Sequence, residues 1–165
     1  MIRLICGSAA TLDAEDVGGE AIADCLGVAP PAAWPPEHND RATRDWMRAL
    51  LEQNPGEPGY ACWYIVADER LVGVIGFKGP PTAQGDVEIG YAIVETEQRK
   101  GHGVAAAGLM VAQAFADPRV KRVVAETLLR LTASQKVLTR CGFVHVGGHL
   151  DAEEGQIMRF ERART

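Results

Sequence analysis

Residues 86–103 contain the groups of this chain whose types and spacing could do chemistry: one glutamate and one basic turn with two glycines. From 87 to 94, large side chains alternate with a carboxylate and mostly small ones: Val87, Ile89, Tyr91 and Ile93 against Glu88, Gly90, Ala92 and Val94. This period of two predicts a strand with one packed face and one open face. Glu88 on the open face leaves room for a ligand and could act there as a general base.

The second group, residues 98–103, reads Gln-Arg-Lys-Gly-His-Gly and leads into an apolar stretch. Gly101 and Gly103 allow backbone N–H groups to approach an anion closely, and the N-terminus of the following helix adds partial positive charge. The two basic residues of the turn add full charges. The segment is therefore a candidate phosphate-binding turn, and we call residues 98–104 the cradle.

The turn has a second interpretation, the dinucleotide fingerprint G-x-G-x-x-A, which positions 101–106 also fit. Glu126, at the end of a Val-rich run, would be the acidic residue of that fingerprint. The order of elements argues against it, because a dinucleotide fold has this turn near its beginning. The roughly forty residues after Glu126 are too few for the remaining βα units. A plain glycine turn with solvated basic side chains is the third interpretation.

Periodicity and turn residues predict the elements that must position these groups. Strands are expected at 1–6, 60–67, 71–77, 86–94, 122–126, 143–147 and 156–161. Helices are expected at 11–26, 40–53, 104–116 and 132–140. Between the first two helices, four prolines in residues 29–37 exclude regular structure, and Trp34 is expected to fill the space between those helices.

Composition and charge bound the class of protein. The 165 residues are 47% hydrophobic and 6% aromatic, which suits a single globular domain over residues 1–165. The net charge of −5 argues against nucleic acid and an anionic membrane as partners. The four cysteines lie far apart without metal-ligand spacing, so neither a metal site nor a disulfide framework is predicted. No signal peptide and no apolar run of ~20 residues are found, which predicts a cytoplasmic protein.

Two motifs of the chain resemble the signatures of the GNAT superfamily of acyl-CoA-dependent N-acetyltransferases. Residues 98–103 are similar to its Q/R-x-x-G-x-G/A signature, which follows the fourth strand and binds pyrophosphate. Residues 132–143, which read TASQKVLTRCGF, are similar to its second signature, a short helix that ends in Gly-Phe. The two motifs have the order and spacing of the family. The tract 34–37 further resembles the branch of ribosomal-protein N-terminal acetyltransferases and their small-amine-modifying relatives.

The resemblance implies an α/β fold with a mixed, mostly antiparallel sheet of about seven strands, about four flanking helices and a splay between strands 4 and 5. It also implies acetyl-CoA as co-substrate, lying in the splay, and no metal. The residues that it assigns to the pantetheine are Ala92, Ile93 and Val94. The residues that it assigns to the phosphates are Gln98, Arg99, Lys100, Gly101, His102, Gly103 and Val104.

In that family an amine attacks the thioester directly, so the resemblance implies acetyl transfer to a primary amine of a small molecule or a protein N-terminus. Such an amine is largely ammonium at neutral pH and needs a base. Glu88 is the candidate base, acting through a water molecule. Its alternative role is that of a structural carboxylate paired with a neighbouring basic side chain.

Two positions depart from the family pattern. Many members carry Tyr, which protonates the leaving sulfur, where Leu138 stands here, and many carry Asn where Leu131 stands. Ser134 is the remaining candidate to assist the thiolate from beside the cofactor. Cys141 could alternatively form a covalent acyl enzyme, but a cysteine before Gly-Phe more often packs as a small hydrophobic side chain.

These departures favour a rival function, that of a non-catalytic acyl-CoA-binding or sensing module. A dinucleotide-binding protein remains the less favoured alternative. The expected partners are a small-molecule amine or a protein N-terminus, with a second copy of the chain as a further candidate. The sequence leaves open which amine is the acceptor and whether the chain is a homodimer.

Overall fold

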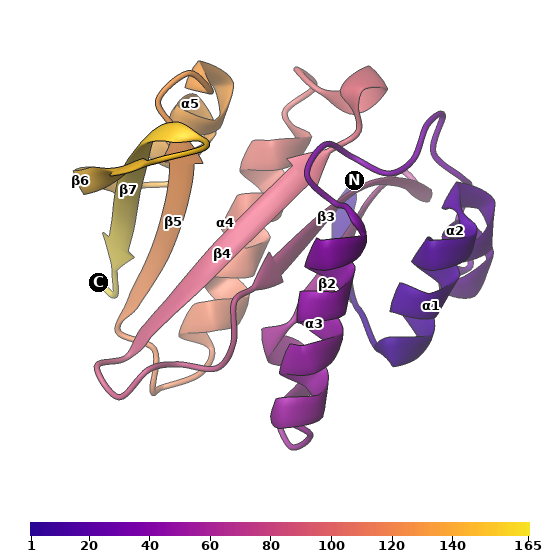
Figure 1. The fold of residues 1–165 in the computed structure, drawn as a ribbon, viewed down its shortest axis with the longest axis horizontal. Helices are drawn as coiled ribbons and strands as arrows, with labels where there is room; N and C mark the ends of the chain where they lie inside the picture. Colours follow the sequence, from indigo (N-terminus) through magenta and orange to yellow (C-terminus); the bar gives the residue numbers. More distant parts are fainter.

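The computed structural model describes all 165 residues. Its strands form one sheet (Figure 1): β1 (Ile2–Cys6), β2 (Cys62–Ala67), β3 (Arg70–Phe77), β4 (Asp86–Ile93), β5 (Arg122–Leu128), β6 (Val144–Asp151) and β7 (Gly155–Ala163). Their order in the sheet is β1-β2-β3-β4-β5-β7-β6, and only the β4–β5 pair is parallel. The predicted α/β fold with a mixed, mostly antiparallel seven-stranded sheet is therefore confirmed.

Five α-helices and two 3₁₀ helices connect the strands: α1 (Ala9–Val17), α2 (Gly19–Leu26), α3 (Arg41–Gln53), η1 (Pro58–Tyr60), η2 (Glu95–Glu97), α4 (His102–Phe115) and α5 (Thr132–Arg140). The single helix predicted over 11–26 is wrong, because the chain divides it into α1 and α2. Gly18 between them has φ 150° and ψ −180°, a conformation that favours glycine. The N-cap of α1 is Ser8, whose side chain accepts a hydrogen bond from the Thr11 N–H.

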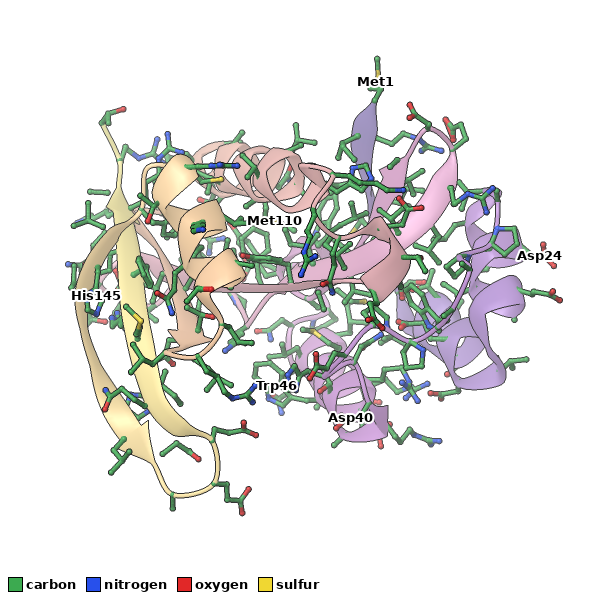
Figure 2. The ribbon with its side chains drawn as sticks, turned by 90° about the horizontal axis from the view of Figure 1, so that it is seen from above. Met1, Asp24, Asp40, Trp46, Met110 and His145 are labelled. Carbon is green, nitrogen blue, oxygen red and sulfur yellow. The ribbon has the colours of Figure 1, made fainter.

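The helices cover both faces of the sheet (Figure 1). α4 and α5 lie on one face, and Met110 of α4 is fully buried between α4 and the sheet (Figure 2). α1, α2 and α3 lie on the other face, over the half of the sheet that contains β1 to β4. Trp34 packs beside Ile22 of α2 and Tyr64 of β2, so it fills space between a helix and the sheet, whereas the prediction placed it between two helices. Every helix is too short or too polar to span a bilayer.

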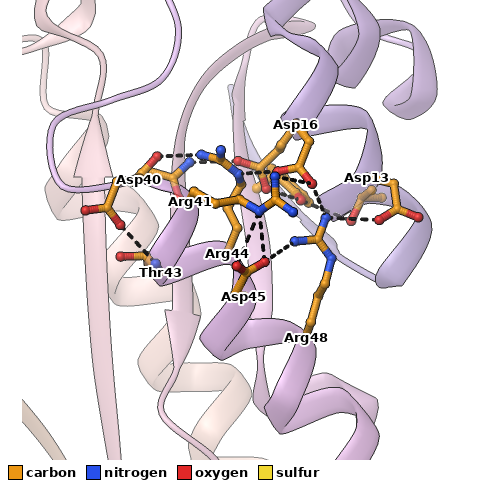
Figure 3. A network of polar contacts seen from close by, with 12 residues as sticks. Asp13, Asp16, Asp40, Arg41, Thr43, Arg44, Asp45 and Arg48 are labelled. Atoms are coloured by element: carbon orange, nitrogen blue, oxygen red, sulfur yellow. Dashed lines mark hydrogen bonds and ion pairs between the residues drawn. The ribbon is translucent and has the colours of Figure 1, made fainter.

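Ion pairs join α1 to α3 (Figure 3). Arg48 Nη2 lies 2.9 Å from Asp13 Oδ1 and also contacts Asp16, while Arg48 Nη1 lies 2.7 Å from Asp45 Oδ1. Arg44 Nε donates to Asp16 Oδ1 at 2.7 Å. The side chains of Arg44, Arg48 and Asp16 are 13%, 20% and 21% exposed, so part of this network is shielded from solvent. The network holds α1 in place against α3.

β4 has the two faces that its alternation predicts. Four of its residues lie in the core under α4 or pack against it: Val87, Ile89, Tyr91 and Ile93. Three face the α3 side of the sheet: Glu88, Gly90 and Ala92. Val94, just beyond the strand, differs from the predicted open face, since it is only 2% exposed and its N–H still bonds to the carbonyl of Val72 in β3.

β4 and β5 separate before they end. Their parallel pairing covers residues 86–89 and 122–125, and beyond it the two ribbons diverge toward their C-terminal ends (Figure 1). The predicted splay between strands 4 and 5 is therefore confirmed. The topology also contradicts the dinucleotide alternative, because a dinucleotide fold is built on a mostly parallel sheet.

The C-terminal hairpin is longer than the sequence predicts, with β6 and β7 paired from residue 144 to residue 161. β7 lies beside β5, which leaves β6 as an edge strand. Val144, Val146 and Leu150 of β6 are 64%, 51% and 76% exposed. An edge with such side chains is a surface on which another chain can pair.

Candidate functional site

The gap between β4 and β5 exposes backbone hydrogen-bonding groups. The Lys78 N–H donates to the Glu88 carbonyl at 2.9 Å, so the even-numbered residues of β4 bond to β3. Because the bonding direction alternates along a strand, Tyr91 and Ile93 direct their N–H and C=O groups toward the gap. β5 no longer pairs with β4 there. A ligand in the gap can therefore bond to β4 as an added strand would.

The cradle, residues 98–104, connects the end of this gap to the N-terminus of α4. Gly101 is the N-cap of α4, with φ 84° in the left-handed region, and Arg99 also has a positive φ of 65°. The first N–H groups of α4 have no partner within the helix. The turn thus presents backbone donors and the positive end of a helix dipole, which together suit an anion.

The side chains of the cradle are held in different ways. Gln98 Nε2 donates to the Ile93 carbonyl at 3.0 Å, so this amide ties the cradle to the end of β4. Lys100 Nζ and His102 Nε2 each lie 3.2 Å from Glu97 Oε2. Although desolvation opposes the shift, these contacts lower the pKa of Glu97. An anion in the cradle would meet the charge of Lys100 only in competition with Glu97.

α5 packs against the cradle through Val137, which lies beside Gly103. A Cβ on Gly103 would lie 3.4 Å from Val137 Cγ2 and 3.8 Å from Tyr91 Cε2, so this glycine permits the close approach of α4, α5 and β4. Ser134 Oγ lies 3.1 Å from the Tyr91 hydroxyl, which places the serine beside β4. Leu138 is 1% exposed in the core, so this position offers no polar group to the gap.

A cavity of about 400 Å³ lies on the α3 side of β4. Its lining comes from α1, residues 37–39, α3, β2, β3, Lys78 and β4. Gly76 and Gly90 contribute small lining positions, and Trp46 and Met47 of α3 contribute apolar ones. Figure 2 shows Trp46 on the side of α3 that faces the C-terminal hairpin. Because Gly90, Tyr91 and Ala92 belong to its lining, the cavity adjoins the strand that borders the gap.

Glu88, the predicted base, forms an ion pair with Lys78 through Oε2. The two side chains are 25% and 39% exposed, so solvent reaches both. The other carboxylate oxygen, Oε1, makes no hydrogen bond within the chain. This arrangement matches the alternative interpretation of Glu88 as a paired carboxylate, and it also leaves one oxygen available on the face that Gly90 shares with the cavity.

Glu15 of α1 is a candidate that the sequence patterns did not single out. It lines the cavity, although only 5% of it is exposed to solvent. Its two oxygens accept hydrogen bonds from Asn39 Nδ2 and the Tyr64 hydroxyl, each at 2.7 Å. One signal was present in the sequence, because Glu15 follows Leu12 by three residues and therefore occupies the apolar stripe of its helix.

Neither buried thiol is arranged for nucleophilic chemistry. Cys141 Sγ lies 3.4 Å from the Val104 carbonyl in the core, and burial raises the pKa of Cys141. Burial also raises the pKa of Cys62, which lines the cavity, to about 12. Both thiols are therefore protonated at neutral pH, which disfavours a covalent acyl enzyme on Cys141. No three His, Cys, Asp or Glu side chains cluster so as to hold a metal ion.

Comparison of the sequence with known families and proteins gives two matches. A family model described as "Acetyltransferase (GNAT) domain" matches residues 9–144. A curated protein of Bacillus subtilis (strain 168), described as "Uncharacterized N-acetyltransferase YjdG", is 35% identical over 101 residues. That match spans 60% of this chain and 60% of the length of the relative.

Comparison with solved structures shows the same fold at low sequence identity. RimL, a ribosomal L7/L12 alpha-N-protein acetyltransferase in complex with coenzyme A, has a TM-score of 0.72 at 18% identity, over 98% of this chain and 93% of that chain. The aminoglycoside acetyltransferase AAC(6')-Ib in complex with coenzyme A has a TM-score of 0.69 at 15% identity, over 99% of this chain and 95% of that chain.

Proposed function

The chain belongs to the GNAT family of acetyltransferases, and on that premise we propose that it transfers the acetyl group of acetyl-CoA to a primary amine. The observation that supports this proposal most directly is the backbone of β4 that faces the gap without a β5 partner, at Tyr91 and at the Ile93 N–H, and that leads into the cradle. The Ile93 carbonyl already accepts from Gln98. Pantetheine amides need backbone partners, and pyrophosphate needs clustered N–H donors. The gap and the cradle supply these groups in the order in which they occur along coenzyme A.

In this proposal the pantetheine borders Ala92, Ile93 and Val94, and the phosphates bind along residues 98–104. The backbone of the cradle carries most of the phosphate binding, since the Gln98 amide is bonded to Ile93 and two further side chains are bonded to Glu97. Arg99 is exposed and has no ion-pair partner in the chain, so it is the free cation of the cradle.

Glu88 is the proposed base. An acceptor amine with a pKa near ~10 must lose a proton before it attacks the thioester carbon, and the free Oε1 of Glu88 can accept that proton through a water molecule. Displacement of Lys78 by the incoming cation would free the second oxygen as well. The amine then attacks directly, the carbon–sulfur bond breaks, and no covalent enzyme intermediate forms.

The leaving thiolate has a pKa near ~8.5 and therefore tolerates departure without a strong acid. The Ser134 hydroxyl, bonded to that of Tyr91, is the proposed hydrogen-bond donor to the sulfur. Because burial raises the pKa of Tyr91, this tyrosine stays protonated, and its hydroxyl can donate a hydrogen bond to Ser134 Oγ while Ser134 donates to the sulfur.

The acceptor is proposed to bind in the cavity between α1, α3 and β4. Its class is either a small-molecule amine or a protein N-terminus, as in AAC(6')-Ib and RimL, whose names describe acetylation of an aminoglycoside and of a ribosomal protein. A homodimer is proposed as the assembly, because β6 is an exposed edge strand with apolar side chains.

The rival function is an acyl-CoA-binding or sensing module, which the absence of a polar group at Leu138 favours. One experiment distinguishes the two: release of CoA thiol from acetyl-CoA is measured with a broad panel of amines, beside titrations of CoA and NADH. Amine-dependent thiol release supports the enzyme. Tight CoA binding without turnover across the panel supports the module, and NADH binding without CoA binding contradicts both.

A further inference from the structure

We propose that Glu15 binds a second cationic group of the acceptor, and that the acceptor is therefore a small aliphatic diamine. This inference rests on the proposed acetyl transfer and adds the class of amine to it. Glu15 lies on the α1 side of the cavity, away from Glu88 and the gap. In this arrangement one amine is acetylated near β4 while the other remains an ammonium ion at Glu15.

The first observation is that Glu15 is a buried carboxylate without a cation. It is 5% exposed, and its hydrogen-bond donors, Tyr64 and Asn39, are both neutral. None of the ion pairs of the chain includes Glu15, and the nearby Arg44 is bonded to Asp16 and to the Asn39 carbonyl. An ionised carboxylate has about four acceptor positions, so roughly two remain for a ligand.

The second observation is that an ionised carboxylate costs free energy at this buried position. Burial raises the pKa of Glu15, against the opposing effect of its hydrogen bonds. Glutamine could keep both of these bonds if the Asn39 amide turned over, because each amide offers a donor and an acceptor. A structural role therefore does not require a charge here. A cation that enters the cavity would offset the cost of the charge and would gain a strong, poorly screened interaction.

The third observation is the shape of the cavity between Glu15 and the gap beside β4. Tyr64, Val74 and Ala92 stand side by side on β2, β3 and β4, so Tyr64 lies two strands, or about 10 Å, from the edge of the gap. Between them, small and apolar residues line the cavity: Gly76, Gly90, Trp46 and Met47. A flexible aliphatic chain of a few methylene groups between two nitrogens suits a path with this small and apolar lining.

The test compares diaminopentane with aminopentane, which has the same chain without the second charge. The wild-type protein is expected to prefer the diamine by at least ~10-fold in kcat/KM, mainly through KM. Glu15→Gln should remove that preference by lowering kcat/KM for diaminopentane toward the value for aminopentane. Glu15→Asp, which retains the charge, should restore part of it. Glu20→Gln on the exposed surface of α2 is the matched control.

Two results would overturn the inference while leaving acetyl transfer intact: equal use of both amines by the wild type, or an unchanged diamine preference in Glu15→Gln. Preference for a protein N-terminal peptide over both amines would also overturn it. Failure of the proposed function looks different, because no amine is then acetylated. In that case the binding of diaminopentane is measured by calorimetry. Binding by the wild type that is lost in Glu15→Gln supports the role of Glu15. Equal binding by the wild type and by Glu15→Gln contradicts it.

Discussion

Glu88 is paired with Lys78 and has one free oxygen, and these two facts decide what its substitution should do. Glu88→Gln keeps the shape of the side chain but cannot accept a proton. We expect it to lower kcat by roughly 10²-fold, with partial recovery at higher pH as free amine accumulates, and to leave CoA affinity unchanged. The measurement is kcat between about pH 6 and 9 with a good acceptor.

The matched control is Glu95→Gln, because Glu95 is an exposed carboxylate shortly after the end of β4. If Glu88→Gln keeps near-normal kcat over the whole range, Glu88 is not the base. A loss of activity in Glu95→Gln instead would identify that residue as the better candidate.

The raised pKa of Glu15 predicts how this residue affects stability. A carboxyl whose pKa is higher in the folded state contributes stability that is present below its unfolded pKa, near ~4.3, and lost as pH rises through the folded pKa. Relative to wild type, Glu15→Gln should therefore become more stable between about pH 4 and pH 8. Urea midpoints of both proteins at these two pH values measure the change. The opposite trend would show that the ionised carboxylate stabilises the fold.

At the scale of single residues, the sequence predicts what depends on local chemistry. Gly101 lies at a left-handed position of a turn before a helix, which is the backbone conformation that its residue type suggests. Lys78 and Glu15 could not be predicted as site residues, because their partners lie on other elements. Glu88 meets Lys78 across the β3–β4 pairing, and Glu15 meets Asn39 across a separation of 24 positions.

The pairing of α1 with α3 predicts a salt-dependent stability. The Arg48 side chain is 20% exposed and contacts carboxylates of both helices, whereas the Arg41 side chain is 67% exposed and reaches Asp16 of α1 only at 4.0 Å (Figure 3). Arg48→Met should lower the free energy of unfolding by about 1 kcal/mol, or Tm by about 2–4 °C, at low salt. Arg41→Met should change it much less. Equal losses in both variants, or a loss that 1 M salt does not reduce, would contradict this account.

The cradle predicts a selective defect in phosphate binding. Gly101→Val forces a β-branched residue into a left-handed conformation, which displaces the backbone donors without any neighbouring atom being struck. CoA binding should therefore weaken by at least ~10-fold, while binding of pantetheine, which lacks the phosphates, should hardly change. Gly108→Val, in the middle of α4 and equally free of neighbours, is the control. Equal weakening of both ligands would indicate a general loss of structure.

The boundaries of helices and strands are predicted less well than their presence. The central strand and the apolar helix after the cradle are predicted well, because their periodicity is continuous. The single helix over 11–26 is not, since a Gly-Gly pair in a helical pattern can be tolerated or can end a helix. Here a Cβ at Gly19 would lie 2.9 Å from Trp34 Cβ, a tertiary contact that the local sequence does not reveal.

At the scale of the whole molecule, two short motifs in the right order predict the fold, because each marks one side of the gap between β4 and β5. The cavity, in contrast, has no continuous sequence motif. Its lining comes from separate segments of the chain, so its charge and shape depend on how those segments pack. For this reason the sequence predicts a coenzyme site more readily than an acceptor.

A ligand that fills the gap should stabilise both halves of the sheet, because the gap separates β4 from β5. β4 and β5 pair over only four positions each, residues 86–89 and 122–125, and a ligand that bonds to the free backbone of β4 closes the remaining length. CoA at roughly 100 times its Kd should stabilise the fold by about 2.7 kcal/mol and raise Tm by about 5–11 °C. It should also slow hydrogen exchange at the Tyr91 and Ile93 amides, which face the gap, more than at the Val94 amide, which already bonds to the Val72 carbonyl. NADH should do neither. If CoA raises Tm while both gap-facing amides exchange as fast as before, coenzyme A binds elsewhere on the molecule, and the assignment of the β4–β5 gap is wrong.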